Sequence, residues 1–221
     1  MSILGAKEIV QEQSVVRNKE QQRVFDYLTN KQQPCCLIKN MTDLEFVQYV
    51  STQLAMLEIK KKALAKIGLD EAEVNEIAPV NFEDYNFDGA YVRQTESGVY
   101  VSNIIESTWL FFSDTQVYLY RYQYFLDRDK KKEQTEEYFY KDIVGMSTSS
   151  KEEKTKSVVS FKKQGCANIN QTNIANNEHI EQTKFCIKVP GDSLYVSMKG
   201  TTENEDVVQA MKAKLREKKN S

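Results

Sequence analysis

The sequence predicts an α+β protein, in which a helical N-terminal region is followed by an antiparallel β-domain that ends in a helix. Two observations lead to this class. Apolar residues recur at three- and four-residue steps before about residue 80, and they alternate with polar residues after it. The chain has 221 residues, with 12 Tyr and 10 Phe to bury, so it can form a core without disulfides.

The helical region is expected to cover residues 1–79 and to open with two helices. A first, weakly amphipathic helix spans Lys7 to Asn30. A second, over Met41–Lys66, has the stronger pattern, because Thr42 and Glu45 stand three residues apart as a capping box requires. Its apolar positions share one face, and three successive lysines are expected to close it at the C-terminal end, where the helix dipole favours cations.

A second capping box, Asp70 with Glu73, predicts a short helix that stops before Pro79. Residues 80–90 then form a predicted linker between the two units. Within it, Asp84, Asn86 and Asp88 precede Gly89 and match the first half of a calcium loop. The bidentate carboxylate of the second half is missing, since Thr95 stands at its place. We therefore interpret the run as a turn and expect no metal and no cofactor.

The β-domain is expected over residues 91–221. Ser97-Gly98, Ser113-Asp114 and Pro190-Gly191 mark its turns. An Asn-rich run at 164–182 is expected to be a mobile loop. Thr201–Lys219 has the pattern of a final amphipathic helix. The predicted strands are Tyr91–Thr95, Val99–Ile105, Thr108–Phe112, Gln116–Leu126, Glu136–Met146, Lys156–Lys163, Lys184–Val189 and Leu194–Met198.

About seven antiparallel strands followed by one amphipathic helix resemble the pleckstrin-homology (PH) superfold. The segments TQVYLYRYQYFL, EEYFYKDIVGMSTSS and KFCIKVPGDSLYVSM are similar to those of small bacterial PH-like domains. The resemblance covers residues 91–218 and implies a binding or scaffolding role, toward phosphoinositides or protein segments. Lipid-binding members carry basic residues at the first hairpin tip. Here the candidate tips, Thr95–Gly98 and Glu106–Thr108, carry acid and hydroxyl groups, which argues against phosphoinositides.

A row of tyrosines is the most unusual feature of the β-domain. In Gln116–Leu126 four tyrosines share one face by the two-residue period, while Val117, Leu119 and Phe125 share the other, which we assign to the core. The tyrosine row is expected to be covered, by the N-terminal helices through Val47, Leu54 and Leu57 or by a second chain. It is also our candidate partner surface. Its members are Tyr118, Tyr120, Tyr122 and Tyr124, extended by Tyr138 and Tyr140.

A run of three lysines is the candidate phosphate site. Lys130, Lys131 and Lys132 lie at a predicted hairpin tip, where three carboxylates, those of Asp127, Asp129 and Glu133, offset them. The main interpretation is a solvated loop. The alternative is a peripheral binder of anionic lipid that uses this loop and the basic end of the final helix.

Catalysis receives little support from the sequence. His179 is the single histidine and lies in the Asn-rich run, and the four cysteines have no metal-binding spacing. A net charge of −2 does not suit a nucleic-acid binder. With no apolar run of membrane-spanning length and no secretory signal, a cytoplasmic location is expected.

We predict a non-catalytic binding or scaffold module, with protein partners or self-association. A small enzyme with a site between the two halves is the competing class.

Overall fold

The computed structural model describes residues 15–30, 40–70, 72–74, 77–164 and 169–220. Within these residues, eleven strands form three sheets, and none of the sheets closes into a barrel. The helices are α2 (Lys19–Thr29), α3 (Asp43–Leu57), α4 (Ile59–Ile67) and α5 (Thr202–Asn220), with a 3-10 turn, η1 (Tyr140–Asp142). The strands are β1 (Ile77–Tyr85), β2 (Tyr91–Gln94), β3 (Tyr100–Ser102), β4 (Ile104–Phe112), β5 (Gln116–Phe125), β6 (Lys131–Phe139), β7 (Gly145–Lys154), β8 (Ser157–Gln164), β9 (Ile169–Asn176), β10 (His179–Val189) and β11 (Asp192–Ser197).

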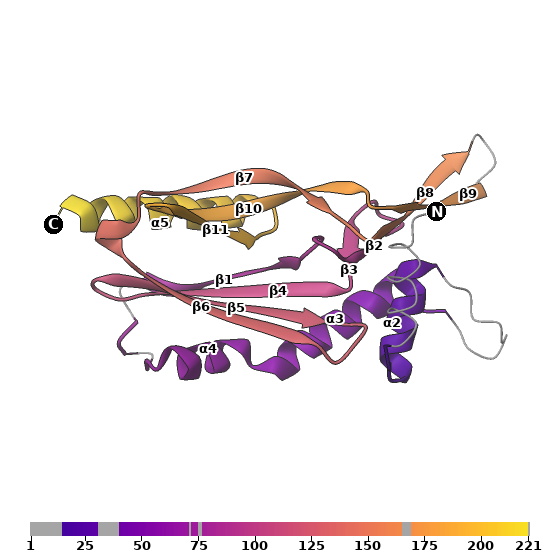
Figure 1. The fold of residues 1–221 in the computed structure, drawn as a ribbon, viewed down its shortest axis with the longest axis horizontal. Helices are drawn as coiled ribbons and strands as arrows, with labels where there is room; N and C mark the ends of the chain where they lie inside the picture. The colour runs from indigo at the N-terminus through magenta and orange to yellow at the C-terminus, as the bar shows by residue number, and fades with distance from the viewer. Residues whose placement is uncertain (1–14, 31–39, 71, 75–76, 165–168, 221) are drawn as a thin grey trace.

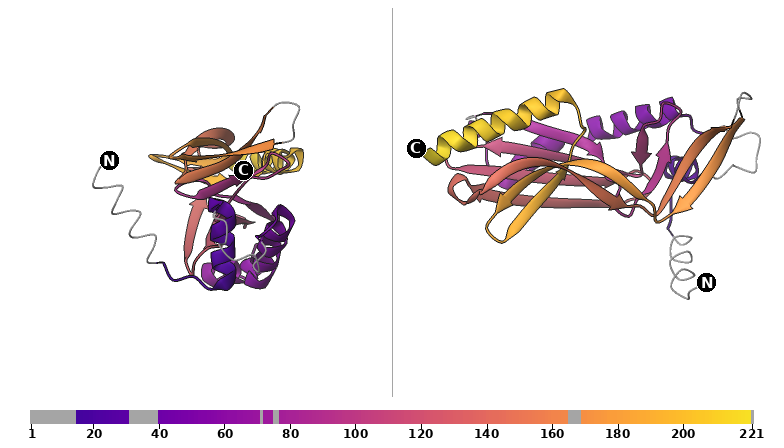
Figure 2. Two further views of the ribbon diagram at one scale, coloured as in Figure 1. Left: turned by 90° about the vertical axis from the view of Figure 1, so that its right-hand side faces the viewer. Right: turned by 90° about the horizontal axis from the view of Figure 1, so that it is seen from above.

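The first sheet has the order β1-β4-β5-β6, the second has the order β11-β10-β7, and every pair of neighbours in them is antiparallel. A third sheet, β3-β2-β8-β9, stands at one end of the molecule and contains one parallel pair, β2 with β8. The first two sheets lie in separate layers along the long axis, and α5 runs beside the second sheet (Figures 1 and 2). The α+β class is thus confirmed.

The main core lies between the first sheet, the second sheet and α5. Val117 and Leu119 of β5 are fully buried in it, as the two-residue period predicts. Phe82 of β1 meets Phe185 of β10, with ring centroids 5.5 Å apart. Val208, Met211 and Leu215 bring the apolar side of α5 into the same core. Burial of these side chains holds the two sheets and the final helix together.

α3 and α4 lie on the opposite face of the first sheet, below it in Figure 1, whereas α2 packs against β2 and β8 of the third sheet. α2 begins at Lys19, because Asn18 and Gln21 form a capping box, so residues 15–18 precede the helix that was expected to start at Lys7. Residues 7–14 lie outside the described part of the chain. The predicted box of Thr42 and Glu45 is present at the start of α3.

The predicted helix Met41–Lys66 is two helices. Glu58 has a left-handed backbone (φ 44°), which ends α3 and starts α4 in a new direction. The three lysines that were expected to close the helix therefore lie in the first turns of α4. The box of Asp70 with Glu73 forms its hydrogen bonds, but residues 72–74 make only a turn, and β1 already begins at Ile77. Residues 71, 75 and 76 of the predicted third helix are not described.

Three predictions about the strands need correction. Residues 80–85, expected in a linker, belong to β1, which pairs with β4 along the edge of the first sheet. Glu106–Thr108, interpreted as a hairpin tip, lie inside β4, because their side chains are buried by the second sheet and by β1. The Asn-rich run contains β9 and the start of β10 in place of the expected loop, while residues 165–168 lie outside the description. Asn173 is partly exposed and Asn176 is exposed, which suits an edge strand such as β9.

Candidate functional site

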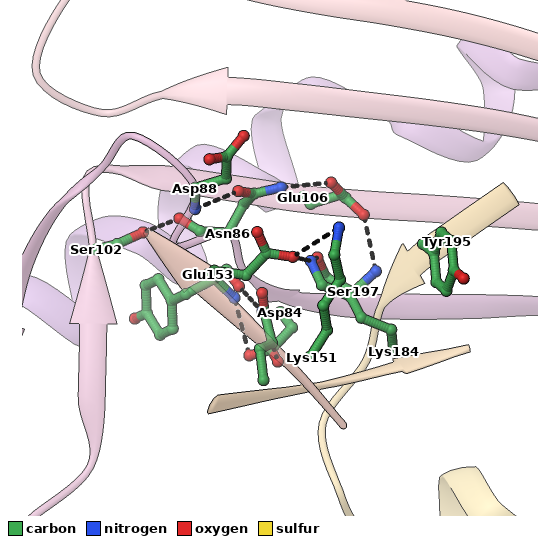
Figure 3. Close-up of polar contacts among 12 residues, drawn as sticks. Asp84, Asn86, Asp88, Ser102, Glu106, Lys151, Glu153, Lys184, Tyr195 and Ser197 are labelled. Atoms are coloured by element: carbon green, nitrogen blue, oxygen red, sulfur yellow. Dashed lines mark hydrogen bonds and ion pairs between the residues drawn. The ribbon is translucent and has the colours of Figure 1, made fainter. Parts of the chain in front are cut away.

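A buried network of charged and amide side chains lies between the first and second sheets, and Figure 3 shows most of it. Its centre is Glu106 on β4, which is 2% exposed. Its carboxylate accepts hydrogen bonds from Asn86 Nδ2 at 2.9 Å, Gln123 Nε2 at 2.8 Å and the Ser197 backbone N–H at 2.9 Å. Arg121 Nε lies 3.7 Å from Glu106 Oε1. The strands β1, β4, β5 and β11 all approach this one carboxylate.

Electrostatics keeps Glu106 ionised. Burial works to raise its pKa, because a desolvated carboxylate is costly. The positive charge of Arg121 and the hydrogen bonds from Gln123, Ser197 and Asn86 outweigh burial, so the pKa of Glu106 lies below its ordinary value. The charge of Glu106 is therefore a permanent part of the folded structure at neutral pH.

The network satisfies backbone groups at the edge of β11. This strand pairs only with β10, so alternate residues turn a carbonyl and an amide away from the sheet. The carbonyl of Tyr195 accepts a hydrogen bond from Arg121, and the amide of Ser197 donates to Glu106. At the edge of β1, Gln182 Nε2 donates to the carbonyl of Tyr85. The buried polar side chains thus replace the missing neighbouring strands.

A second ion pair extends the network along β10. Lys184 and Glu153 are 4% and 7% exposed, and Lys184 Nζ lies 3.3 Å from Glu153 Oε1. Lys184 Nζ also donates to Ser197 Oγ at 2.9 Å, as Figure 3 shows. A serine next to a lysine is one arrangement of a nucleophile and its base. Here Ser197 is fully buried and Lys184 is engaged by Glu153, so a substrate could not reach the pair.

Asp84 lies where this network meets the surface. Burial raises the pKa of its carboxyl, against hydrogen bonds from the Tyr85 N–H and Gln182 and the charges of Lys199 and Lys184. It stands directly across the β1–β4 ladder from Glu106. The pKa values of the two carboxyl groups are thus shifted in opposite directions, that of Asp84 upward and that of Glu106 downward. Of the two, Asp84 lines an open hollow.

That hollow is part of what we call the α3–β1 groove. One half, of about 460 Å³, lies between α3 and β1 and is lined by Val47, Ser51, Ala55, Asp84, Ile105 and Lys199, among others. The other half, of about 440 Å³, lies beside α4 and is lined by Ile59, Lys60, Lys61, Leu64 and Trp109, among others. Leu54 and Glu83 line both halves, so the two hollows adjoin. On α3, Leu44 and Val47 remain 67% and 49% exposed.

The predicted tyrosine surface is covered by the chain's own helices. Tyr120 and Tyr122 are buried against Ile59 and Ala63 of α4, with Leu54 and Leu57 packed beside them. Tyr118 and Tyr124 are partly buried in the same cluster. The expected cover through Leu54 and Leu57 is present, but Val47 is half-exposed and lines the groove.

Tyr138 and Tyr140 do not extend the tyrosine row, contrary to the prediction. Tyr138 pairs with Val117 across β5 and β6, and residues opposite each other in a ladder share a face. Tyr138 therefore faces the main core, where it is partly buried. Tyr140 belongs to η1 and is also buried in that core, with its hydroxyl donating to the carbonyl of Ser113.

The predicted phosphate site is divided between a turn and a strand. Lys130 lies at the hairpin tip over the ring of Phe125, 4.9 Å from its centroid. Lys131 begins β6 and has its Nζ 2.8 Å from Glu133 Oε1, while Lys132 is exposed on the same strand. Asp127 is fully buried and accepts hydrogen bonds from Asn103 and Arg128, which makes it an anchor of the turn.

The remaining candidates are spread apart. Asn86 and Asp88 of the half calcium loop bond to each other, and the Asn86 amide is also held by Glu106. His179 is exposed at the start of β10, 4.0 Å from a Glu152 oxygen. Among the residues that the structure describes, no group of three or more His, Cys, Asp or Glu side chains is placed to hold a metal ion. No described helix is both long and apolar enough to cross a membrane.

Glu106, Gln182 and Lys184 are members of the network that the sequence did not predict. A signal existed for part of the network, because Arg121 and Gln123 interrupt the apolar face of Gln116–Leu126. Charged or amide residues at core positions indicate buried partners. The partner of both is Glu106, which stands opposite Gln123 on the preceding strand β4, at a position that the sequence placed at a hairpin tip. Comparison with protein-family models, curated proteins and solved structures finds no match to this chain.

Proposed function

We propose that the chain is a non-catalytic cytoplasmic binding module, built on a PH-like plan, which binds a segment of a protein partner in the α3–β1 groove. The observation that carries the proposal is the contrast between the two polar regions. The charged network is buried, and its side chains form hydrogen bonds with backbone groups at the edges of strands. The groove is open, mainly apolar beside α4 and mixed polar and apolar beside β1, and it is flanked by exposed apolar residues of α3.

The order of the strands supports the PH-like plan. β1, β4, β5 and β6 follow one another as neighbours, then β7, β10 and β11, and then α5. Seven antiparallel strands and a final helix are what the resemblance implies. The pairs β2–β3 and β8–β9 are additions that form the third sheet. The first strand of this plan starts at Ile77, fourteen residues before the predicted start at Tyr91.

The alternatives have weaker support. For the lipid binder, Lys130 and Lys131 of the candidate loop already contact Phe125 and Glu133, and on α5 Lys214 and Lys218 pair with Glu217 and Asp114. For an enzyme, a site needs convergent titratable groups in an open cleft. The convergent groups described here lie around Glu106 and Lys184, which are almost fully buried, and Asp84 at the edge of this network lines the groove.

Two neighbouring variants test the groove. Ser51 and Thr52 are both exposed hydroxyl residues of α3, but only Ser51 lines the groove. We would select peptides from a random displayed library on the full chain. Trp109 lines the groove and is the single tryptophan, so its fluorescence reports binding of a selected peptide.

We expect Ser51→Arg to lower the affinity for a selected peptide by at least about tenfold, and Thr52→Arg to lower it by less than about twofold. Both variants should keep the melting temperature of the parent. The proposal fails if no peptide is enriched over a blank surface, or if the two arginine variants bind the selected peptides equally well.

A further inference from the structure

β6 forms an outer edge of the first sheet, and half of its backbone groups point away from that sheet. The β5–β6 ladder is regular. Its phase is fixed at both ends by hydrogen bonds, from the Phe125 N–H to the Lys130 carbonyl and from the Tyr140 N–H to the Thr115 carbonyl. Hydrogen bonding alternates along an antiparallel ladder. The even-numbered residues of β6 therefore bond to β5, and the odd-numbered residues turn their N–H and C=O groups outward.

The outward groups of β6 have no partner in the described part of the chain. By contrast, Arg121, Glu106 and Gln182 hold outward backbone groups at the edges of β11 and β1. β6 also carries exposed side chains on both of its faces, such as those of Lys132 and Thr135, so a neighbouring strand has access to it. The edge of β6 is thus available for pairing with another chain.

The charges of β6 are symmetric about Gln134. In the sequence KKEQTEEYF, two lysines lie two and three residues before Gln134, and two glutamates lie two and three residues after it. An antiparallel second copy with Gln134 opposite Gln134 therefore brings Lys132 opposite Glu136 of the other copy. Lys131 comes opposite Glu137 in the same way, and the two-fold symmetry repeats both pairs.

Backbone and charge favour the same register. With Gln134 opposite Gln134, odd-numbered residues face odd-numbered residues, so their outward N–H and C=O groups can exchange hydrogen bonds in pairs. A shift of each strand by one residue keeps this phase, but it places Glu133 opposite either Glu133 or Glu137 of the other copy. Like charges directly opposite each other are destabilising. The symmetric register is therefore preferred over its neighbours.

Most of the charges that meet in this register have no opposite charge within the chain itself. Among the described residues, Lys132, Glu136 and Glu137 have no ion-pair partner. Glu136 does accept a hydrogen bond from Gln134 Nε2 at 2.8 Å, but this amide carries no charge. The attraction between Lys132 and Glu136 thus remains available to a second copy.

Glu133 is the one charged residue of β6 that would meet no opposite charge across the pair. It would face Thr135 of the other copy, whose hydroxyl can donate a hydrogen bond to it. Its charge is balanced within its own chain, because Lys131 Nζ lies 2.8 Å from Glu133 Oε1 and Lys66 Nζ lies 3.7 Å from Glu133 Oε2. The symmetric register therefore leaves no charged residue of β6 directly opposite a like charge.

We propose that two copies of the chain form a dimer in which their β6 strands pair antiparallel about Gln134, so that the two first sheets become one continuous sheet. Charge on an edge strand usually prevents pairing with other chains. In β6 the order of the charges permits one register with a second copy of the same strand. The two-fold pair closes on itself, so association stops at two copies. This surface is separate from the α3–β1 groove, and the inference does not rest on the proposed function.

Sedimentation of the full chain from about 1 to about 300 µM measures the dimer. One strand pair buries less surface than a standard interface, so we expect a Kd of about 10–100 µM. Lys132→Glu and Glu136→Lys should each raise this Kd at least about fivefold, because each places like charges opposite each other at two symmetric positions. Lys219→Glu, at an exposed residue of α5, is the control, and it should change the Kd by less than about twofold.

A mixture of the two charge variants is the sharpest test of the register. In a mixed dimer, the new Glu at position 132 of one copy faces the new Lys at position 136 of the other, and the original Glu136 faces the original Lys132. Opposite charges then meet at both positions again. We expect the mixed dimer to form with a Kd within about twofold of the parent, although each variant alone associates poorly.

Thr135→Pro tests the strand pairing itself. The Thr135 N–H points outward, so proline removes no hydrogen bond between β5 and β6, and edge strands accept proline at such positions. We expect the Kd of the dimer to rise at least about tenfold. At about 1 µM, where the chain is a monomer, the melting temperature should stay within about 5 °C of the parent. If this variant does not fold, the charge variants decide alone.

Four results would overturn the inference. The chain could remain a monomer at about 300 µM. The mixed charge variants could associate no better than each variant alone, which would reject the register. A folded Thr135→Pro variant could dimerise like the parent, which would reject strand pairing. A dimer that persists in the β6 variants and is lost in Ser51→Arg would place the second copy in the α3–β1 groove.

Discussion

Glu106 shows why a carboxylate lies at the centre of this molecule. It receives hydrogen bonds from three elements and faces Arg121, so its removal leaves a guanidinium without its counter-charge. We predict that Glu106→Gln lowers the free energy of unfolding by about 3 kcal/mol, in the range found when one partner of a buried pair is removed. Urea unfolding measures this. Glu137→Gln, an exposed glutamate on β6, should cost less than about 0.5 kcal/mol. Equal effects of the two substitutions would contradict the role of Glu106.

The same residue should make stability depend on pH. The folded-state pKa of Glu106 is lowered from its ordinary value of 4.5. The unfolded chain therefore takes up this proton more readily, and the contribution of Glu106 is complete above about pH 4.5 and is lost as the pH falls through the folded-state pKa. The difference in unfolding free energy between the parent and Glu106→Gln should shrink as the pH falls below about 4.5 and through the folded-state pKa of Glu106. Asp84 titrates in the opposite sense, but it is present in both proteins and cancels. A difference that is constant with pH would disagree with this prediction.

At the scale of elements, α4 depends on the tyrosines of β5. Tyr120 is fully buried beneath Ile59 and Ala63. We predict that Tyr120→Ser lowers the free energy of unfolding by about 3–5 kcal/mol, as for other buried aromatic residues. Amide hydrogen exchange should show that Ile59–Ile67 loses more protection than β10 does. Phe139→Ser, at a residue that is 46% exposed, is the control and should change neither quantity appreciably. Unchanged exchange in α4 would show that the helix is held elsewhere.

The sequence predicted the elements whose signals are local. Each of these elements is formed by residues that are close together in sequence. They are the capping boxes at Thr42 and Asp70, the turns at Gly98 and Gly191, and the alternating faces of β5. Features set by distant segments were not predictable in the same way. Residues 80–85 contain turn formers and became a strand because β4 pairs with them. Glu58 has a left-handed backbone conformation, which is uncommon for a glutamate and so could not be predicted from the residue type.

For the candidate site, the sequence located the apolar face and the interruptions at Arg121 and Gln123, but not their partners. Their partner Glu106 lies on the preceding strand, at a position interpreted as a hairpin tip, while the other members Ser197 and Gln182 are more than fifty residues away in sequence from the strands that they meet. Their roles follow from the packing of the second sheet on the first. The groove could not be predicted from the sequence either, because its shape depends on how α3 and α4 pack against the tyrosine face of the first sheet.

At the scale of the molecule, the helices and the sheets share two apolar clusters. One joins Phe46 and Val50 of α3 to Val101 and Ile105, and the other joins α4 to the tyrosines. We therefore predict one cooperative unfolding transition, with the fluorescence of Trp109 and far-ultraviolet circular dichroism giving the same midpoint. Two separated midpoints would show instead that the helical region unfolds on its own, as the predicted boundary near residue 80 implies.

The edge of β11 has a further consequence for the behaviour of the chain in concentrated solution. A strand with a free edge can recruit the same strand from another molecule, and repeated recruitment leads to fibrils. Here the outward carbonyl of Tyr195 and amide of Ser197 are already held by Arg121 and Glu106. A second molecule would have to displace two charged side chains before it could add a strand. The charged centre of the protein thus also protects this edge against self-templated strand addition.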